Sequence, residues 1–536
     1  MNPRVLYHLA RADFLERVRR YSFLVTLALT LYAAYEANRG NIVLSLGEYR
    51  GLYNSAWLGL LLSTTATMLV TMAGFYIIKN TVERDRQTGV GQILAGTPIG
   101  RITYLAGKVL SNFAVLFVIM AILACAAVAM QLWRAEETGI DPWKLLAPFL
   151  FFTVPAFAFL AALAVLFECV PGLRGGFGNV FYFFFWVALL AGGLESKFLM
   201  LDLLGAGTIQ HGVQMRAASE LSDYKGGFSF NIGPNDGRVY KTFLWKGMDW
   251  TAPLILSRLA WMAFALLVLL LAAAFFDRFD PSRGLLHRFV RAGRRIAFSP
   301  AETAEDLGAS GATAERPGAV PPSAPLHLTP LLEQEPKPRF AGVLSAELRL
   351  MLKGRSRWWY LVALGLFIGS FFAPAGEPRG KVLAFAWLWP VLVWSAMGTR
   401  EARHDTGPLI FSSARALERQ LPAVWLAGAG VAALAGAGAG ARALLAGDWR
   451  HLLAWAVGTM FIPALALALG VWSGTSKLFE GLYTALWYVG PLQPTRGLDF
   501  MGASPHIPAS EPLFYLGATV VLLAAAAVGR RRQIRA

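Results

Sequence analysis

Long apolar runs separated by polar segments dominate this chain. Four of them, at 58–78, 109–130, 145–167 and 254–276, reach the roughly 20 residues that an α-helix needs to cross the hydrocarbon core of a bilayer. Shorter runs count as spans where the charge of the flanking loops agrees. The pattern predicts an all-α, polytopic membrane protein with about twelve transmembrane helices. The predicted spans are 21–35, 55–78, 109–130, 145–167, 177–194, 253–276, 358–373, 382–397, 422–445, 452–472, 479–490 and 512–528.

An interruption after the sixth span divides the chain into two halves. Its first part, 281–298, interleaves apolar residues with arginines and predicts a basic amphipathic helix on the inner leaflet. Its second part, 299–339, is rich in Ala, Pro, Gly and Glu without apolar periodicity, which is typical of a flexible tether. The predicted domains are 1–280, a six-span unit with an N-terminal amphipathic helix and an extracytoplasmic loop at 195–251; 281–339, the basic helix and linker; and 340–536, a second six-span unit.

The two halves repeat each other before their first spans. Apolar residues recur at four-residue spacing in each half, with an acidic and a basic residue beside them, and the two sets are 334 residues apart. This spacing predicts an amphipathic helix that lies along the membrane. The first set is Leu6, Ala10, Phe14 and Val18 with Asp13 and Arg19; the second is Phe340, Leu344, Leu348 and Leu352 with Glu347 and Lys353.

Two further echoes follow in the same order. After the second span of each half comes a longer loop, and beyond the fifth span the motif at 201–206 returns at 498–503. Six spans is an even number, so both halves have the same orientation and form a parallel repeat. In the loops Glu83, Thr88, Gly89 and Arg101 are matched, 318 residues later, by Glu401, Thr406, Gly407 and Arg419.

Charge decides the orientation. The net charge is +16, from 49 Lys and Arg against 33 Asp and Glu, and the basic excess falls in alternate loops. The loop at 195–250 instead holds six acidic and six basic residues. This is the positive-inside pattern, and we therefore read the charge as orientation, with no nucleic-acid partner. Both termini are predicted to be cytoplasmic.

Motifs for several kinds of chemistry are absent from the sequence. It contains no G-x-x-x-x-G-K-[ST] phosphate loop and no H-E-x-x-H, and its seven histidines are scattered at no ligand spacing. We expect no metal site, no catalytic residues and no cofactor bound by the chain itself. Ionisable residues in spans are few; Glu168, Arg258 and Arg442 are expected to be interfacial, snorkelling side chains.

Small and aromatic residues supply structural expectations. Asp202 and Asp499 are expected to cap short helices that dip into the outer membrane face, as re-entrant motifs with Gly205 and Gly502. The Gly- and Ala-rich stretch 427–441 permits close helix approach and suggests part of the interface between the halves. Aromatic residues of spans five and eleven suggest either an apolar path or lipid-facing packing: Phe181, Phe183, Phe184, Phe185, Trp186, Trp487 and Tyr488.

These features, taken in their order along the chain, resemble those of a known family. An inner-leaflet helix, two spans and an E-x-x-x-x-T-G loop that leads through Pro98 and a basic residue into span three resemble the membrane subunit of bacterial ATP-binding-cassette (ABC) exporters of the type 2 class. The segment 83–108 matches best. The second half matches less well, because Ala416 and Leu426 stand where Pro98 and Lys108 would repeat.

The resemblance implies a permease in the bacterial cytoplasmic membrane, driven by two separate ABC ATP-binding subunits that hold the ATP and Mg²⁺. The chain itself would not be an enzyme, and its other partners would be membrane lipid and an unknown substrate. A membrane-embedded lipid or glycan transferase and a secondary transporter remain alternatives. The residues implied in ATPase-coupling loops are Glu83, Arg84, Asp85, Thr88, Gly89, Pro98, Arg101, Glu401, Arg403, Thr406, Gly407 and Arg419.

Overall fold

The fold is known from a computed structural model. It describes residues 3–19, 21–134, 136–137, 139–195, 202–221, 224, 226–232, 239–279, 340–355, 357–373, 377–404, 406–413, 415–492, 497–504 and 507–535. The basic helix and the tether predicted between 281 and 339, and Leu201 of the repeated motif, lie outside these ranges.

Helices make up nearly all of the first half. The order is α1 (Pro3–Val18), α2 (Tyr21–Arg39), β1 (Ile42–Ser45), β2 (Tyr49–Gly51), α3 (Ser55–Thr65), η1 (Ala66–Val70), α4 (Thr71–Ile78), α5 (Thr81–Gln87), α6 (Val90–Gly96), α7 (Arg101–Arg134), α8 (Pro142–Pro148), η2 (Phe149–Thr153), α9 (Val154–Cys169), α10 (Gly176–Glu195), α11 (Ala206–Glu220), β3 (Ser229–Ile232), β4 (Lys241–Phe243) and α12 (Ala252–Phe275).

The second half follows the same course without described strands. Its elements are α14 (Phe340–Leu352), α15 (Arg357–Phe372), α16 (Glu377–Leu388), α17 (Val391–Trp394), α18 (Arg400–Arg403), α19 (Gly407–Phe411), α20 (Ala416–Ala435), α21 (Ala437–Leu445), α22 (Trp449–Ser473), α23 (Lys477–Trp487), η4 (Tyr488–Leu492) and α24 (Ser510–Arg535).

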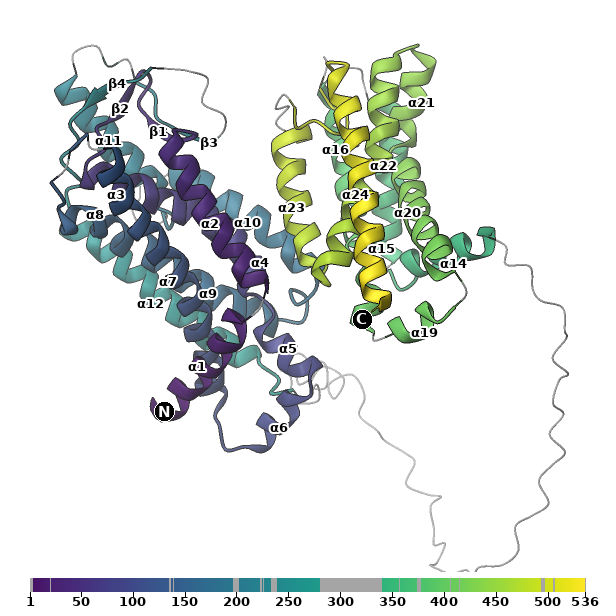
Figure 1. The fold of residues 1–536 in the computed structure, drawn as a ribbon, viewed down its shortest axis with the longest axis horizontal. Helices are drawn as coiled ribbons and strands as arrows, with labels where there is room; N and C mark the ends of the chain where they lie inside the picture. Colours follow the sequence, from purple (N-terminus) through teal and green to yellow (C-terminus); the bar gives the residue numbers. More distant parts are fainter. Residues whose placement is uncertain are drawn as a thin grey trace, which may run out of the picture.

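Equivalent helices pack in the same pairs in both halves. In the first half α1 packs on α7 and α9 on α12; in the second, α14 packs on α20 and α22 on α24. Each half closes around its own core, which includes Trp57 and Phe157 in the first and Trp387 and Trp394 in the second. Figure 1 shows the halves side by side. We call the end with both termini, α5, α6 and α19 the terminal end, and the end with α11 and the strands the distal end.

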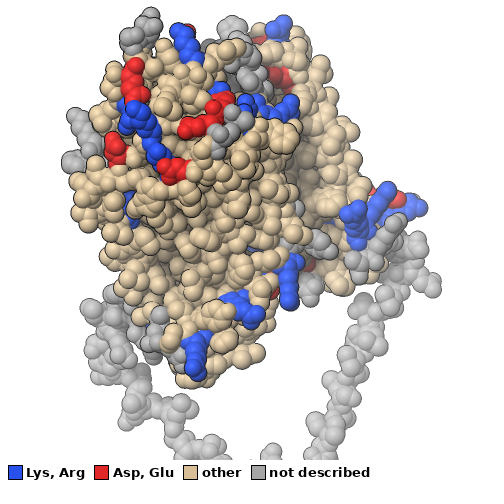
Figure 2. Space-filling view, turned by 60° about the vertical axis from the view of Figure 1, so that its left-hand side comes forward, with Lys and Arg blue, Asp and Glu red and all other residues tan. Residues whose placement is uncertain are grey.

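Seven of the described helical segments are long and apolar enough to cross a membrane, or eight if the bent pair α20 and α21 forms one span. That pair bends by 66° at Gly436, where a Cβ atom would lie 2.7 Å from Nε1 of Trp387. α15 and the segment Gly380–Trp394 are apolar but shorter. The count of twelve spans therefore stays a prediction. Figure 2 shows a broad surface without charged side chains between charged groups at the distal and terminal ends, as a lipid-facing belt requires.

The loops of the first half build a small cap at the distal end. β1 pairs antiparallel with β3, with Ile42 opposite Ile232, and β2 pairs parallel with β4, with Tyr49 opposite Lys241. A bidentate ion pair between Arg50 and Glu136, with the shorter contact at 2.8 Å, ties β2 to the segment after α7. Beside the cap, α11 packs on α10, and Thr208 near its start accepts a hydrogen bond from Arg258 of α12.

The halves meet through α10 and α23, with α4 beside them. The prediction that residues 427–441 form part of this interface is wrong, because α20 and α21 pack on α22, α14 and α15 of their own half. A Cβ atom at Gly428 would lie 2.7 Å from the ring of Pro463 on α22. The small residues therefore allow close packing inside the second half.

Candidate functional site

A sharp elbow joins the second span to the loop predicted to couple with an ATPase. Lys79 ends α4, and Asn80 adopts φ 113° and ψ 18°, a backbone conformation that residues other than glycine rarely hold. The chain then forms α5, turns again at Gly89 with φ 76°, and forms α6. Because such strain persists only where surrounding contacts over-determine it, the contacts of α5 are informative.

Glu168 at the end of α9 holds the start of α5. Its side chain is 3% exposed, and its carboxylate accepts hydrogen bonds from the backbone N–H groups of residues 80, 81, 82 and 83 at 2.6–3.1 Å and from the Thr81 hydroxyl at 3.1 Å. The N-terminal N–H groups of a helix lack partners within it, and a negative charge there is stabilising. The expectation of a snorkelling Glu168 is therefore wrong: the side chain is a buried cap supplied by another helix.

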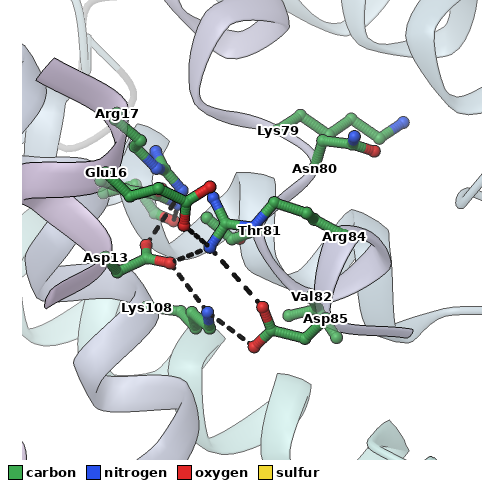
Figure 3. A network of polar contacts seen from close by, with 12 residues as sticks. Asp13, Glu16, Arg17, Lys79, Asn80, Thr81, Val82, Arg84, Asp85 and Lys108 are labelled. Atoms are coloured by element: carbon green, nitrogen blue, oxygen red, sulfur yellow. Dashed lines mark hydrogen bonds and ion pairs between the residues drawn. The ribbon is translucent and has the colours of Figure 1, made fainter. Parts of the chain in front are cut away.

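Asp13 of α1 is the centre of a buried ion network (Figure 3). Its carboxylate, 5% exposed, lies 2.5 Å from Arg84 of α5, 2.9 Å from Lys108 of α7 and 3.3 Å from Arg17. Burial alone would raise the pKa of Asp13, but the charges of Lys108, Arg17 and Arg84 outweigh it and lower that pKa well below its usual value. Asp13 is therefore ionised at neutral pH and joins α1, α5 and α7.

Two further carboxylates, one on α5 and one after α12, connect α5 to its neighbours. Asp85 is buried, accepts a hydrogen bond from Tyr104 at 2.7 Å and lies 2.8 Å from Lys108. Asp277, just after α12, lies 3.0 Å from Arg86 and 3.1 Å from Arg174. α5 is thus attached to α1, α7, α9 and the end of α12, and a force on it is passed to four helices.

The second half has a similar arrangement with fewer ion pairs among its described residues. Gly398 takes φ 74° at the elbow, three residues before Glu401, as Asn80 stands three residues before Glu83. Arg400 lies 3.0 Å from Glu347 of α14, and Glu401 lies 2.8 Å from Arg530 of α24. Burial outweighs the charge of Arg400 at Glu347 and raises the pKa of that carboxyl, the opposite of the direction at Asp13.

The predicted coupling residues fall into two groups. Arg84, Asp85 and Glu401 are anchored in the networks described above. Glu83 is half-buried and accepts a hydrogen bond from Gln87 at 3.2 Å, so the matched acids Glu83 and Glu401 differ in their surroundings. The others lie on or beside the surface of the two loops and the helices after them: Thr88, Gly89, Pro98, Arg101, Arg403, Thr406, Gly407 and Arg419.

Sequence reasoning missed the exposed apolar side chains of the two loops. On α6 Ile93 is 72% exposed and Val90 43%, and on α19 Leu409 is 77% exposed. The helices that carry these residues, α6 and α19, lie at the terminal end (Figure 1). Exposed apolar side chains in a loop outside the spans are available for contact with a partner protein. The available signal was an apolar residue in each loop within four residues after the T-G pair.

A buried polar relay links the first elbow to the second half. Lys79 donates to Oδ1 of Asn179 on α10 at 2.6 Å, and the Asn179 amide donates to Glu480 of α23. Lys477 of α23 returns the contact by donating to the backbone carbonyl of Lys79. Lys79, Asn179 and Glu480 are each at most 3% exposed. Around them the aromatic residues of spans five and eleven meet, with Phe183 and Tyr488 ring centroids 5.6 Å apart.

The repeated aspartates both accept backbone hydrogen bonds, but only Asp202 caps a described helix, α11; Asp499 stands in a turn, with no helix among the described residues between η4 and α24. Oδ2 of Asp202 accepts from the backbone N–H and the hydroxyl of Thr208, both at 2.7 Å, and Gly205 takes φ 75°. Asp499 accepts from the N–H groups of residues 501, 503 and 504 at 2.7–3.3 Å, and Gly502 takes φ 69°. The same backbone turn therefore stands at both stations.

The two arginines expected to snorkel, Arg258 and Arg442, differ from each other. Arg258 is 1% exposed and donates to the carbonyl of Asp202 at 2.5 Å and to the Thr208 hydroxyl at 3.1 Å, so the snorkelling prediction is wrong for it. These oxygens accept from both terminal nitrogens of the guanidinium and offset the cost of its burial, while its Nε has no partner among the described residues. Arg442 is half-exposed and donates to the carbonyl of Phe371 at 2.9 Å.

The comparisons with known proteins agree with the geometry of the first half. Residues 7–204, from α1 to the Asp202 turn, match the model of a family described as ABC-2 family transporter protein. No curated protein and no solved structure matches the chain. Together with the apolar helices, the match supports a multi-pass membrane protein and the permease component of an ABC transporter, a transport subunit and not a nucleotide-binding domain. Such a permease implies ATP-binding subunits as partners.

Proposed function

We propose that this chain is the permease of a type 2 ABC exporter, in which two fused six-span halves lie in the bacterial cytoplasmic membrane with both termini in the cytoplasm. Two separate ATPase subunits bind the terminal end, one at the α5–α6 loop and one at the α18–α19 loop. ATP binding and hydrolysis in those subunits drive alternating access. The observation that carries the proposal is the anchoring of α5 by Glu168, Asp13 and Lys108, next to the exposed apolar side chain of Ile93 on α6.

The anchoring supports a mechanical role for the loop. A solvated connection between two spans needs no buried charges, and ion pairs out of water are costly unless their geometry is good. Here four partners of α5 and its N-terminus come from other helices, and Asp277 comes from the segment after α12, so α5 moves with the bundle. The four are Asp13, Tyr104, Lys108 and Glu168. The exposed face of α6 is left for a partner. A push on Ile93 therefore displaces α1, α7 and α9 together.

The relay at Lys79 supports motion of one half against the other. The elbow before α5 contacts Asn179 and, through it, Glu480 of the second half. A change in the direction of α5 at Asn80 therefore alters the contact between α10 and α23. Substrate passes between the halves, where Phe184 and Trp487 ring centroids lie 5.8 Å apart.

The buried carboxylates do not favour the secondary-transporter alternative. Glu168 and Glu480 are the kind of buried acids that an ion path would use. Glu168, however, is occupied by hydrogen-bond donors from the start of α5, and Glu480 accepts from Asn179 beside two lysines. Both carboxylates thus have structural partners at the elbow.

Docking is tested by replacing the exposed apolar residues of the loops. We expect Ile93→Asp with Leu409→Asp to abolish co-purification of the chain with the ATP-binding subunit encoded by a neighbouring gene, because a charge then replaces each apolar anchor. Val239→Asp, at a 95% exposed position of the distal end, is the matched control and is expected to keep the complex. Retention of the ATPase by the double variant would refute the docking surfaces.

The turn between α5 and α6 gives a second prediction. Gly89→Val places a β-branched residue at φ 76°, where the left-handed conformation costs about 1–2 kcal/mol. We expect α6 to shift and ATP hydrolysis by the complex to fall at least threefold. Gly407→Val is the matched control, because Gly407 opens α19 without a positive φ. Equal losses in both variants would show that the conformation of Gly89 is not the cause.

A further inference from the structure

A large cavity lies at the distal end of the first half, away from the coupling loops and the relay. The end of α10, α11 and the segment between β4 and α12 surround a volume of about 930 Å³. That volume falls within the roughly 300–1,000 Å³ typical of small-molecule sites. Leu194, Met215 and Leu254 give it apolar wall, and Gln210 and Gln214 give it hydrogen-bonding groups.

The charge of the lining is strongly negative. Glu195, Asp202, Glu220 and Asp249 contribute carboxylates, whereas Arg216 is the only Lys or Arg among the lining residues. Arg216 already lies 3.2 Å from Glu220 and is neutralised by it. Within the described part of the chain the other three acids form no ion pair within 4 Å, although the buried guanidinium of Arg258 lies near Asp202 and donates to its backbone carbonyl. Four carboxylates therefore stand against two guanidinium groups, and the excess of charge is negative. The cavity therefore attracts a cation.

Two buried polar groups of the lining also lack partners. Asp202 is 3% exposed and its Oδ1 accepts no hydrogen bond, while Trp245 is 1% exposed and its Nε1 donates none. The capping role of Asp202 does not explain this, because only Oδ2 contacts Thr208. In the second half both oxygens of Asp499 accept backbone N–H groups. The free acceptor thus distinguishes the first half from its repeat.

These groups define the ligand class. A bare metal ion does not fit, because no cluster of three His, Cys, Asp or Glu in the described residues could hold one. We propose that the cavity binds a hydrophilic organic molecule that carries a protonated amine and neutral oxygen acceptors, such as an amino sugar or an amino alcohol. The ammonium group meets the carboxylates of Asp202, Glu195 and Asp249, and an oxygen of the ligand accepts from Trp245. A soluble molecule and an amine-bearing lipid headgroup both supply this chemistry.

Calorimetric titration of the purified full-length chain in detergent, with glucosamine as the probe, tests the proposal without an ATPase. We expect saturable binding of glucosamine and at least tenfold weaker binding of N-acetylglucosamine, which keeps the oxygens and loses the charge. Glu195→Gln with Asp249→Asn should weaken glucosamine binding at least tenfold; both side chains are exposed, so folding is not at risk. Glu48→Gln, 82% exposed and outside the cavity, should have no effect.

The two sources of the amine are separated in nanodiscs. If a lipid headgroup is the occupant, discs containing phosphatidylethanolamine will suppress glucosamine binding and discs of phosphatidylglycerol alone will not; equal binding in both assigns a soluble ligand. Equal affinity for glucosamine and N-acetylglucosamine, no binding of either, or unchanged binding in the double variant would overturn the proposal. Loss of ATPase docking with intact glucosamine binding would affect only the transport function.

Discussion

Replacing Glu168 by Ala is expected to release the start of α5. The change leaves the N–H groups of residues 80–83 and the Thr81 hydroxyl without their shared acceptor. Since each unsatisfied buried donor costs about 1–3 kcal/mol, the free energy of unfolding should fall by about 3 kcal/mol or more. Hydrogen exchange at amides 80–87, followed by mass spectrometry, measures the release directly, and a lowered midpoint of thermal unfolding measures the cost.

A matched control separates the cap from a general effect of charge. Glu83→Ala removes a half-buried carboxylate from the same segment, and its one described side-chain partner is Gln87. We expect exchange at residues 80–87 to stay near the wild-type rate in that variant. If Glu83→Ala and Glu168→Ala increase exchange equally, then Glu168 is not the cap of α5.

Replacing Glu480 by Ala is expected to loosen the contact between the halves. The variant leaves the Asn179 amide without its acceptor and removes one of the two carboxylates, Glu168 and Glu480, that act on Lys79 and Lys477. Removing one partner from a buried charge network costs about 3–5 kcal/mol. A protease site inserted between residues 299 and 339 makes the effect visible. After cleavage, the wild-type halves should co-purify and the variant halves should separate.

Glu418→Ala is the control for that experiment, because Glu418 is an exposed residue on α20 of the same half. Its halves should stay together after cleavage. Co-purification of the Glu480→Ala halves at the wild-type yield would show that apolar packing of α10 on α23 is sufficient, and that the relay does not hold the two halves together.

The sequence indicated the helices well because hydropathy and loop charge act locally. The predicted span 55–78 coincides with α3, η1 and α4, and the span 253–276 differs from α12 by one residue at each end. The amphipathic spacing around Asp13 and Glu347 also marked α1 and α14 correctly. Apolar length sets where a helix can lie in a bilayer, and this information is present in any 20-residue window.

The contacts of buried polar residues escaped sequence reasoning. Glu168 stands 85 residues from the last amide that it caps, and Arg258 lies 56 residues from the carbonyl that it holds. Nothing near either residue indicates these partners, so an interfacial position was the simplest expectation. The same holds for the interface between the halves: small residues at 427–441 indicate close packing, but their sequence does not specify which helix approaches.

The two loops that we propose to bind ATPase subunits differ in how they are held. The first presents two helices, α5 and α6, held by a carboxylate with three cations around it; the second presents the short helices α18 and α19, held by single ion pairs at Glu347 and Glu401. In the proposed complex both halves belong to one polypeptide, so each complex contains one loop of each kind. Mutations can therefore change the affinity of each loop for its ATPase subunit independently. A permease built from two identical chains cannot do this, because every substitution there changes both loops.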